Sequence, residues 1–431
     1  MKVSSTSVRG GEQAACRIRL GTSACHAAVF LIAFLVLFSR RPDALLNAQF
    51  YSEDGIYWFA DAYQVGWRCF LIPLGGYLNS VSRMIGMFSL LFPFDQAPLV
   101  MNICALVAGI IPIHIFLSSR FNFIQFEIRL LCGLLYLALP NSFELHATTT
   151  NIQWHLALAG CLILLGNQQS GGLWQLFDFG LLAFVVLDGP LGILLIPIAL
   201  AMRWISGDRR YNLALAALIP SALIQFLFLF FASSRRPAPN GAGIVRLINI
   251  LGGQIFFSGI FGLRTSDQLY RNGLGGLLFF ISAIALVLGV SCFLYALRHG
   301  NSRLRLFCLF AVLVLVFALI HPLASTEGID PQWALLQVPG CGNRYYFFPM
   351  LAFLATLIWM VADTTAKSKF PRYSALALLA FLPIGICRDW HYRPFADLHF
   401  KQTAADFRQA PTGTQFVIPL NPGVTMRITK R

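Results

Sequence analysis

The chain has 431 residues, of which 57% are hydrophobic and only 12% charged, and its formal net charge is +14. Ordinary globular proteins carry about 25% charged residues, so this composition excludes a soluble globular fold and indicates a polytopic membrane protein. The positive charge is spread over loops rather than gathered in one dense patch, which argues against a nucleic-acid-binding protein. The ten cysteines include no Cys-x-x-Cys pair, so neither a zinc site nor a disulfide framework is expected.

The N-terminal segment, residues 1–21, is polar and basic and precedes a first apolar run at residues 27–38. This order is that of a signal peptide, but Ser39-Arg40-Arg41-Pro42 follows where small, cleavable residues would stand. We therefore expect an uncleaved anchor with a cytoplasmic N-terminal tail at residues 1–21.

Residues 81–94 decide the orientation of every later helix. This apolar segment has 14 residues and contains Arg83, whereas a spanning helix needs about 20 residues. The sequence therefore predicts a re-entrant or interfacial helix here. The first outer loop then covers residues 39–96, and its aromatic, Gly- and Pro-rich part suits helices that lie on the bilayer surface.

The remaining apolar runs predict an all-α integral membrane protein with about eleven spanning helices in a transmembrane domain at residues 22–387. After the first, the spans are expected at residues 97–117, 128–142, 152–165, 173–187, 189–204, 213–232, 273–297, 304–322, 345–361 and 373–386. In the outer segment 233–272, apolar residues at helical spacing predict a partly amphipathic helix on the outer leaflet, through Ile244, Leu247, Ile248 and Leu251. Residues 388–431 are too short for much of a core of their own and are expected to form a small outer-face cap.

The charges of the short loops agree with this topology. Basic residues concentrate in the segments placed inside, which include 120–129, 203–210, 298–305 and 363–372, and the short outer loops are acidic. Treating residues 81–94 as a span would place the last three basic segments outside. We therefore expect the N-terminus inside and the C-terminus outside.

This topology collects unusual polar residues on the outer face. Glu53 and Asp54 follow the first span, and they fit either a solvated loop or a pair that binds a metal or acts as a base. Asp188, which precedes Gly189-Pro190, fits a helix N-cap as well as a ligand. Arg344 opens an aromatic span, where it would either snorkel to the surface or hold a phosphate.

These features resemble GT-C-type glycosyltransferases: a single first span, an acidic motif in the first outer loop, a second acidic cluster between the third and fourth spans, and a late arginine. More closely, several short motifs resemble a bacterial group of multi-spanning proteins of this type with a Glu-Asp-Gly motif in the first loop. The motifs are Glu53-Asp54-Gly55, Gly75-Gly76-Tyr77-Leu78-Asn79 with Arg83, Asn151-Ile152-Gln153-Trp154, Arg344-Tyr345-Tyr346-Phe347 and Asn421-Pro422-Gly423.

The resemblance implies transfer of a sugar from a polyprenyl-phosphate donor to a glycan or lipid acceptor on the outer side of a bacterial inner membrane. It implies Asp54 or Glu53 as the catalytic base, with Asp54 the first choice. It further implies a divalent cation, Mg²⁺ or Mn²⁺, on Asp54, Glu144 and His146. Substrate would be bound by Arg344, Asn151, Gln153, Trp154 and Tyr345.

Two other classes of protein stay open. A transporter or flippase for a lipid-linked glycan would show paired repeats and polar residues at the membrane midplane, but here the polar residues gather at one face. A non-catalytic subunit of an envelope-assembly complex is the third reading. No dinucleotide or P-loop motif is present, which disfavours a nucleotide-sugar donor.

Overall fold

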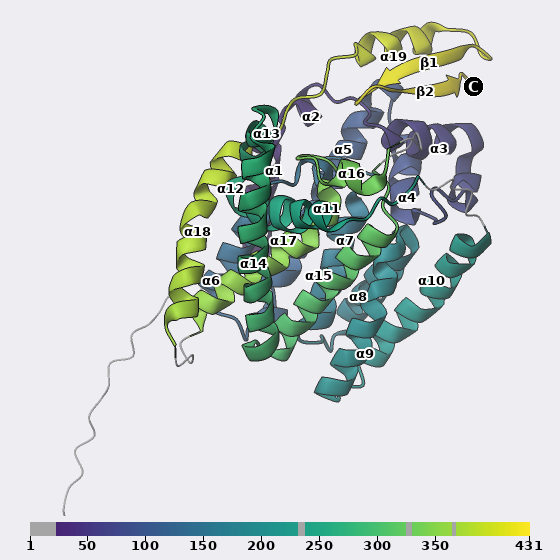
Figure 1. Ribbon diagram of the computed structural model, residues 1–431. Coiled ribbons are helices and arrows are strands. Elements are labelled where there is room, and N and C mark those ends of the chain that lie inside the picture. Colours follow the sequence, from purple (N-terminus) through teal and green to yellow (C-terminus); the bar gives the residue numbers. More distant parts are fainter. Residues whose placement is uncertain (1–22, 232–237, 325–329, 364–367) are drawn as a thin grey trace, which may run out of the picture.

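A computed structural model describes residues 23–231, 238–324, 330–363 and 368–431 (Figure 1). The fold is mostly helical, and helices occupy all eleven segments predicted to span. They are α1 (Ser23–Arg40), α5 (Ala97–Leu117), α6 (Phe126–Leu137), α7 (Ile152–Leu165), α8 (Gly172–Asp188), α9 (Leu195–Ser206), α10 (Tyr211–Phe231), α14 (Gly275–His299), α15 (Ser302–Ile320), α17 (Asn343–Ala362) and α18 (Phe370–Asp389). Short elements connect them: η3 (Phe94–Gln96), η4 (Ser119–Phe121), η5 (Phe143–Leu145), η6 (Pro190–Leu194), α13 (Leu263–Arg271) and α16 (Gln332–Leu336).

Within the described residues, 7 helices are long and apolar enough to cross a membrane, which makes the chain a multi-pass membrane protein. All but one of these coincide with predicted spans. Other predicted spans, such as α6 with 12 residues and α7 with 14, are shorter than a bilayer requires. The count of eleven spans stays a prediction.

The exception is the helix at Ile244–Phe261, which combines α11 (Ile244–Ile248), η7 (Asn249–Phe257) and α12 (Ser258–Phe261). The sequence predicted a partly amphipathic helix on the outer leaflet; α11 has no buried residue, and its place at the leaflet stays a prediction. In η7, Ile250 and Ile255 are buried. The reason is Gly252, where an added Cβ would overlap the Ser282 carbonyl of α14. The two helices therefore pack closely, and α11 runs crosswise to α14 in Figure 1.

Short helices fill the segment between α1 and α5, which we call the first loop. They are α2 (Asp43–Leu46), η1 (Asp54–Phe59), α3 (Ala60–Val65), η2 (Gly66–Leu71) and α4 (Ser80–Ser89). With 10 residues, α4 is too short to span, as expected. Arg83 of α4 is buried: its Nη1 lies 3.0 Å from the Asp61 carboxylate and its guanidinium 5.1 Å from the Trp58 ring centre. The loop thus has an interior of its own.

The C-terminal segment corrects the all-α prediction, because it contains two strands. After α19 (Phe400–Gln409), β1 (Gln415–Leu420) and β2 (Val424–Thr429) form an antiparallel hairpin in which Leu420 pairs with Val424. The alternation that signals these strands is visible in the sequence but short, with Ile418, Leu420, Met426 and Ile428 buried on one face. The hairpin and α19, which we call the cap, lie at one end of the helical bundle beside the first loop (Figure 1).

The cap and the first loop share one hydrophobic cluster. Phe50, Trp58 and Phe59 of the loop pack with Phe400 and Phe407 of α19 and with the buried face of the hairpin. Gly55 permits this contact, because a Cβ there would lie 2.6 Å from Leu420 Cδ1. The glycine of the Glu-Asp-Gly motif therefore serves the docking of the cap.

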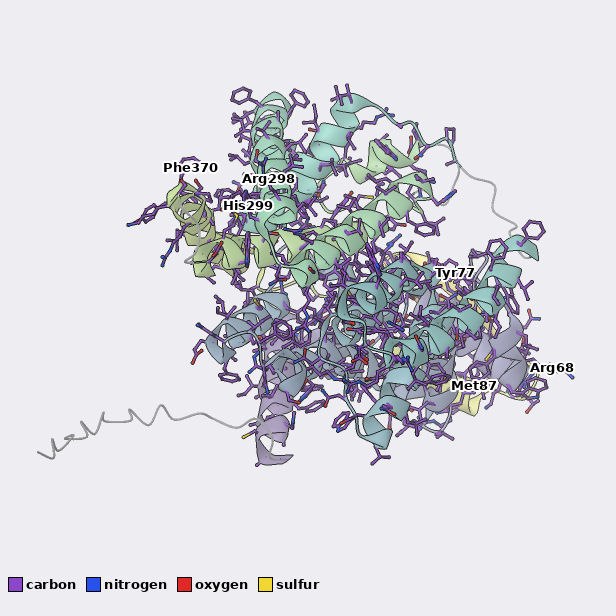
Figure 2. All side chains as sticks on the ribbon, turned by 90° about the horizontal axis from the view of Figure 1, so that it is seen from below. Arg68, Tyr77, Met87, Arg298, His299 and Phe370 are labelled. Atoms are coloured by element: carbon purple, nitrogen blue, oxygen red, sulfur yellow. The ribbon has the colours of Figure 1, made fainter. Side chains whose placement is uncertain are left out.

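A view from below separates the two sides of the bundle. In Figure 2, Arg298 and His299 at the end of α14 lie on the same side as Phe370 at the start of α18, whereas Arg68 and Met87 of the first loop lie on the opposite side. The first loop therefore covers one side of the molecule as well as its cap end.

Candidate functional site

The loop between α6 and α7, residues 138–151, is the junction of the candidate site. The Asn141 backbone N–H donates to Asp389 Oδ2 at 2.9 Å, and its side chain donates to the Gln254 carbonyl at 2.9 Å. The Asn343 side chain donates to the Asn141 carbonyl at 3.1 Å. Three distant helices, η7, α17 and α18, thus fix this loop.

Asp54 lies inside the protein rather than facing solvent. Its side chain is buried, and Oδ2 accepts from the Thr149 backbone N–H at 3.0 Å. Oδ1 accepts from the Thr150 N–H and the Thr150 hydroxyl, both at 2.8 Å. Burial outweighs these hydrogen bonds and raises the pKa of Asp54 to about 7. Asp54 therefore ties the first loop to the junction, and its role as the base stays a prediction.

Glu53 differs from its neighbour. Its side chain is half-buried, and among the described residues its carboxylate has no hydrogen-bond partner and no ion pair. Its negative charge acts on Tyr51 and Arg344, so it lies near both. Of the two acidic residues in the motif, Glu53 is the one with free acceptor oxygens.

Glu144 and Arg344 form an ion pair at the start of α17. Arg344 Nη1 lies 3.3 Å from Glu144 Oε2, and the Gly342 backbone N–H donates to Glu144 Oε1 at 3.2 Å. Gly342 has φ +69°, a left-handed conformation that favours glycine at this helix start. Glu144 thus both neutralises Arg344 and caps α17, where a helix N-terminus attracts negative charge.

Two more buried aspartates cap helices distant in sequence. Asp188 Oδ1 accepts from the backbone N–H groups of Val81 at 2.8 Å and Ser82 at 3.1 Å, at the start of α4. Asp389 accepts from the Leu263 N–H at 2.6 Å, at the start of α13. Of the two readings for Asp188, the structure favours the cap, although the capped helix is not the one that follows it. These carboxylates satisfy backbone donors at the starts of the two helices.

The other predicted site residues surround the same junction. Asn151 donates to the Glu144 carbonyl at 2.6 Å, and the Trp154 ring packs edge-on to Tyr345 at 5.8 Å between centroids. The Tyr345 hydroxyl accepts from the Leu323 N–H at 2.9 Å. Gln153 points elsewhere, toward the turn at Gly189. The Glu144–Arg344 pair is therefore held in place by contacts with Asn151, Trp154 and Tyr345.

The residues named for a divalent cation do not fit one. Both Asp54 oxygens and both Glu144 oxygens accept protein hydrogen bonds, and His146 is buried beside Arg40 and Arg41. Burial and these two arginines lower the pKa of His146 well below its usual value. Within the described ranges, no three His, Cys, Asp or Glu side chains gather as metal ligands. We route no chemical step through a metal.

A polar cavity of about 670 Å³ lies at the cap end of the bundle. Its walls come from the first loop, the junction, α13 and the segment that follows α18. They bring together carboxylates, arginines and tyrosines: Arg41, Tyr51, Glu144, Arg264, Asp267, Arg271, Asp389, Tyr392 and Arg393. Burial, with the charge of Glu144, raises the pKa of Tyr51 to about 12, so its hydroxyl stays protonated. This cavity is the candidate active site.

Sequence reasoning missed Arg41, Tyr392 and Arg393 as parts of the site. Arg40 and Arg41 entered the argument only as residues that prevent cleavage of the first apolar segment. A signal was present, because the predicted orientation puts two arginines directly after the first span on its outer side, against the positive-inside rule. Arginines at a position that the rule disfavours are candidates for a structural or binding role.

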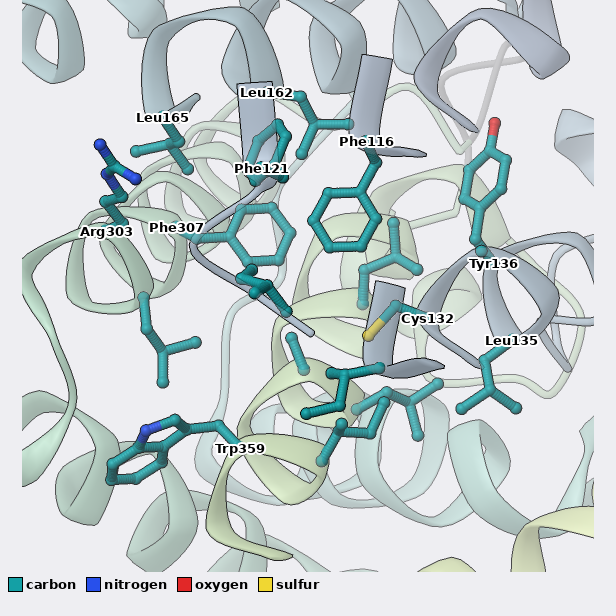
Figure 3. Close-up of a pocket in the computed structure, with 18 of the residues that line it drawn as sticks. Phe116, Phe121, Cys132, Leu135, Tyr136, Leu162, Leu165, Arg303, Phe307 and Trp359 are labelled. Carbon is teal, nitrogen blue, oxygen red and sulfur yellow. The ribbon is translucent and has the colours of Figure 1, made fainter. Parts of the chain in front are cut away.

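A second cavity, of about 260 Å³, lies at the far end of the bundle. Aromatic and aliphatic side chains of α5, α6, α7, α15 and α17 line it, and Figure 3 shows Arg303 and Tyr136 on opposite sides of it. Its lining offers no carboxylate. A binding or catalytic site needs a few polar groups that converge on the ligand, so we place the candidate site in the polar cavity.

Comparison with protein-family models finds no match, and neither does comparison with curated proteins. Among solved structures, the chain is similar to the oligosaccharyltransferase AglB of Archaeoglobus fulgidus in complex with an inhibitory peptide and a dolichol-phosphate. The identity is 12% and the TM-score 0.43, over 90% of this chain and 58% of that one. It is also similar to an Archaeoglobus fulgidus oligosaccharyltransferase tethered with an acceptor peptide, at 12% identity and a TM-score of 0.38, over 91% of this chain and 58% of that one. The chain thus spans less than two thirds of the length of these structures, and we argue function from the site alone.

Proposed function

We propose that the chain is a membrane glycosyltransferase that moves a sugar from a polyprenyl-phosphate donor to a hydroxyl of a glycan or lipid acceptor. The observation that supports it is the polar cavity, whose walls hold a tyrosine and several arginines at one end of a multi-pass bundle, with the free carboxylate of Glu53 close to that tyrosine. A phosphate and a hydroxyl acceptor need these two kinds of group, cations and a base.

The reaction requires little more than positioning. The bond between the sugar C1 and the phosphate oxygen breaks, and the phosphate leaves with the electron pair. The acceptor oxygen bonds to C1 from the opposite face, which inverts the configuration, and its proton passes to the Glu53 carboxylate. Glu53 suits this role because no described residue occupies its oxygens, in contrast to those of Asp54. A positioned general base contributes about 10²- to 10⁴-fold in rate.

Arg344 and Glu144 keep a supporting role in this proposal. The carboxylate already neutralises the guanidinium, at 3.3 Å, so Arg344 meets a donor phosphate only in competition with Glu144. The pair fixes the start of α17, and Asn151, Trp154 and Tyr345 hold it in place. We assign these residues to shaping the substrate site.

The proposed setting is a bacterial inner membrane with the N-terminus in the cytoplasm and the C-terminus in the periplasm. The basic loops predicted inside support this orientation. The cap and the polar cavity would then face the periplasm, where a lipid-linked sugar and an envelope acceptor meet. The lipid chain of the donor would remain in the bilayer beside the bundle.

The purified chain, reconstituted in vesicles with a radiolabelled polyprenyl-phosphate sugar and envelope lipids, tests this function. We expect label to move into a product that no longer carries the donor lipid. If unaltered donor moved from one leaflet to the other and no such product formed, the protein would be a flippase and the proposed enzyme activity would be wrong. Neither activity under conditions where the protein is folded would leave the assembly subunit as the remaining reading.

A further inference from the structure

Arg41 is a buried cation that makes no ion pair with a described residue, and the carboxylate whose charge acts on it, Asp43, lies beyond ion-pair distance. The Arg41 side chain is 4% exposed, and in the described part of the chain no carboxylate lies within ion-pair distance of it. One Nη1–H reaches the His146 carbonyl at 3.5 Å, and Nε has no hydrogen-bond partner. A buried guanidinium with unused donors is costly, and burial accordingly lowers the pKa of Arg41. Such a group calls for an anion.

Arg40 shows what a structural arginine looks like at the same place. Its guanidinium donates to the carbonyls of Leu137 at 2.7 Å and Leu139 at 3.0 Å, and further to those of Asp389 and Trp390. The carbonyl of Leu137 ends α6, where a helix attracts positive charge. The two adjacent arginines are both buried, but they differ in their hydrogen bonds. The N–H groups of Arg40 donate to backbone carbonyls, whereas Arg41 makes one long hydrogen bond and its Nε–H has no partner.

Aromatic rings hold the Arg41 side chain in a defined position. Its guanidinium lies 4.4 Å from the Phe395 ring centre and 5.4 Å from that of Tyr392. Phe395 is held from both sides, because its backbone N–H donates to Asp43 at 2.9 Å and its ring stacks on Tyr51 at 5.0 Å. Stacked aromatic rings orient the planar fork of an arginine while leaving its edge free to donate.

The free edge meets the polar cavity. Arg41 lines the cavity of about 670 Å³ together with Arg393 and Arg264. Arg393 is exposed and, in the described ranges, has neither an ion pair nor a hydrogen bond to its side chain. Tyr51 also lines the cavity, its ring stacked on Phe395, and the charges of Arg41 and Glu53 both act on it. The cations of the cavity are therefore close to the proposed base.

We propose that Arg41 is the primary ligand of a phosphate oxyanion in this cavity, with Arg393 as the second cation. The assignment rests on the proposed function in naming a lipid-borne phosphate, the leaving group of the sugar donor, as the anion. The same chemistry would accept a free pyrophosphate. Guanidinium groups bind phosphate oxygens through two parallel N–H bonds, which are stronger than neutral hydrogen bonds.

Calorimetric titration of the full chain in detergent tests the site without any transfer reaction. The probes are farnesyl phosphate, farnesol, which has the same chain without the phosphate, and inorganic pyrophosphate. The variants are Arg41→Gln and Arg393→Gln, with Arg427→Gln as a control that removes the same charge from an exposed position of β2. We expect Arg41→Gln to weaken farnesyl phosphate binding at least tenfold, Arg393→Gln to weaken it severalfold, and Arg427→Gln to bind as the wild type. Farnesol binding should be unchanged in all.

A folded Arg41→Gln variant that binds farnesyl phosphate as the wild type does would overturn the proposal. So would an equal loss of farnesol binding, since the variant would then have lost the chain contact and not the phosphate. If Arg41→Gln does not fold, wild-type affinity in Arg393→Gln overturns it instead. Arg41-dependent binding of pyrophosphate tighter than farnesyl phosphate supports the oxyanion site with a soluble ligand. Arg41-dependent binding in a protein without sugar transfer would keep this site and reject the proposed enzyme.

Discussion

Asp54 makes the stability of this protein depend on pH in a direction opposite to that of a salt-bridged carboxylate. Burial raises the pKa of Asp54 from 3.8 to about 7 in the folded chain. Between these two values the folded state binds a proton that the unfolded state lacks, so stability falls as the pH rises through this window. The difference of about 3 pKa units corresponds to about 4 kcal/mol between pH 4 and pH 8.

Thermal denaturation in detergent between pH 4 and pH 8, for the wild type and Asp54→Asn, isolates this contribution. Asparagine does not titrate, whereas the other groups titrate alike in both proteins. We expect the stability advantage of the wild type over Asp54→Asn to grow as the pH falls from 8 to 4. A difference that is constant, or that shrinks toward acid, would show that Asp54 is held as an ionised carboxylate by Thr149 and Thr150, and the reasoning from burial would fail.

Three further predictions concern the fold. Gly55→Ala places a Cβ 2.6 Å from Leu420 Cδ1, so it should loosen the cap and cost about 1–3 kcal/mol, measured as faster proteolysis of the hairpin; unchanged proteolysis would reject the docking role of this glycine. Glu144→Gln and Arg344→Ala should be non-additive in melting temperature, the double variant losing less than the sum, with a coupling of about 1 kcal/mol because the pair is partly exposed. Additive losses would mean that the two side chains do not interact. Reporter fusions after residues 210 and 372 should both report the cytoplasm, and a periplasmic signal from either would invert the proposed orientation.

Much of the helical architecture follows from local sequence. The predicted segments are all helical because long apolar runs need only their own hydrogen bonds to form helices. Arg83 and the length of residues 81–94 correctly marked a short helix, α4. The hairpin was missed because its period-two pattern covers only six residues in each strand. The sequence did not show that the helix at Ile244–Phe261 is buried along η7, because that part packs on α14, which lies later in the chain.

The candidate site stays a prediction, and the structure changes the expected contacts. Of Glu53, Asp54, Glu144 and Arg344, only Glu144 lines the polar cavity, while Arg344 pairs with Glu144. Glu144 and the Arg344 backbone N–H that it accepts from are 200 residues apart in the sequence, and no local sequence pattern predicts such a contact. For the same reason the sequence did not show that the Asp54 oxygens accept hydrogen bonds from Thr149 and Thr150, whereas those of Glu53 accept none from the described residues.

The central claim is that Glu53, close to Tyr51 of the polar cavity, is the base of a sugar transfer, and its most direct test is the transfer rate of Glu53→Gln. The matched control is Glu127→Gln, which makes the same change at an exposed position in the first turn of α6. We expect transfer by Glu53→Gln to fall at least 100-fold, as the loss of a general base requires, at an unchanged melting temperature, while Glu127→Gln transfers as the wild type does. Wild-type transfer by a folded Glu53→Gln protein would contradict the assignment of this carboxylate and with it the proposed mechanism.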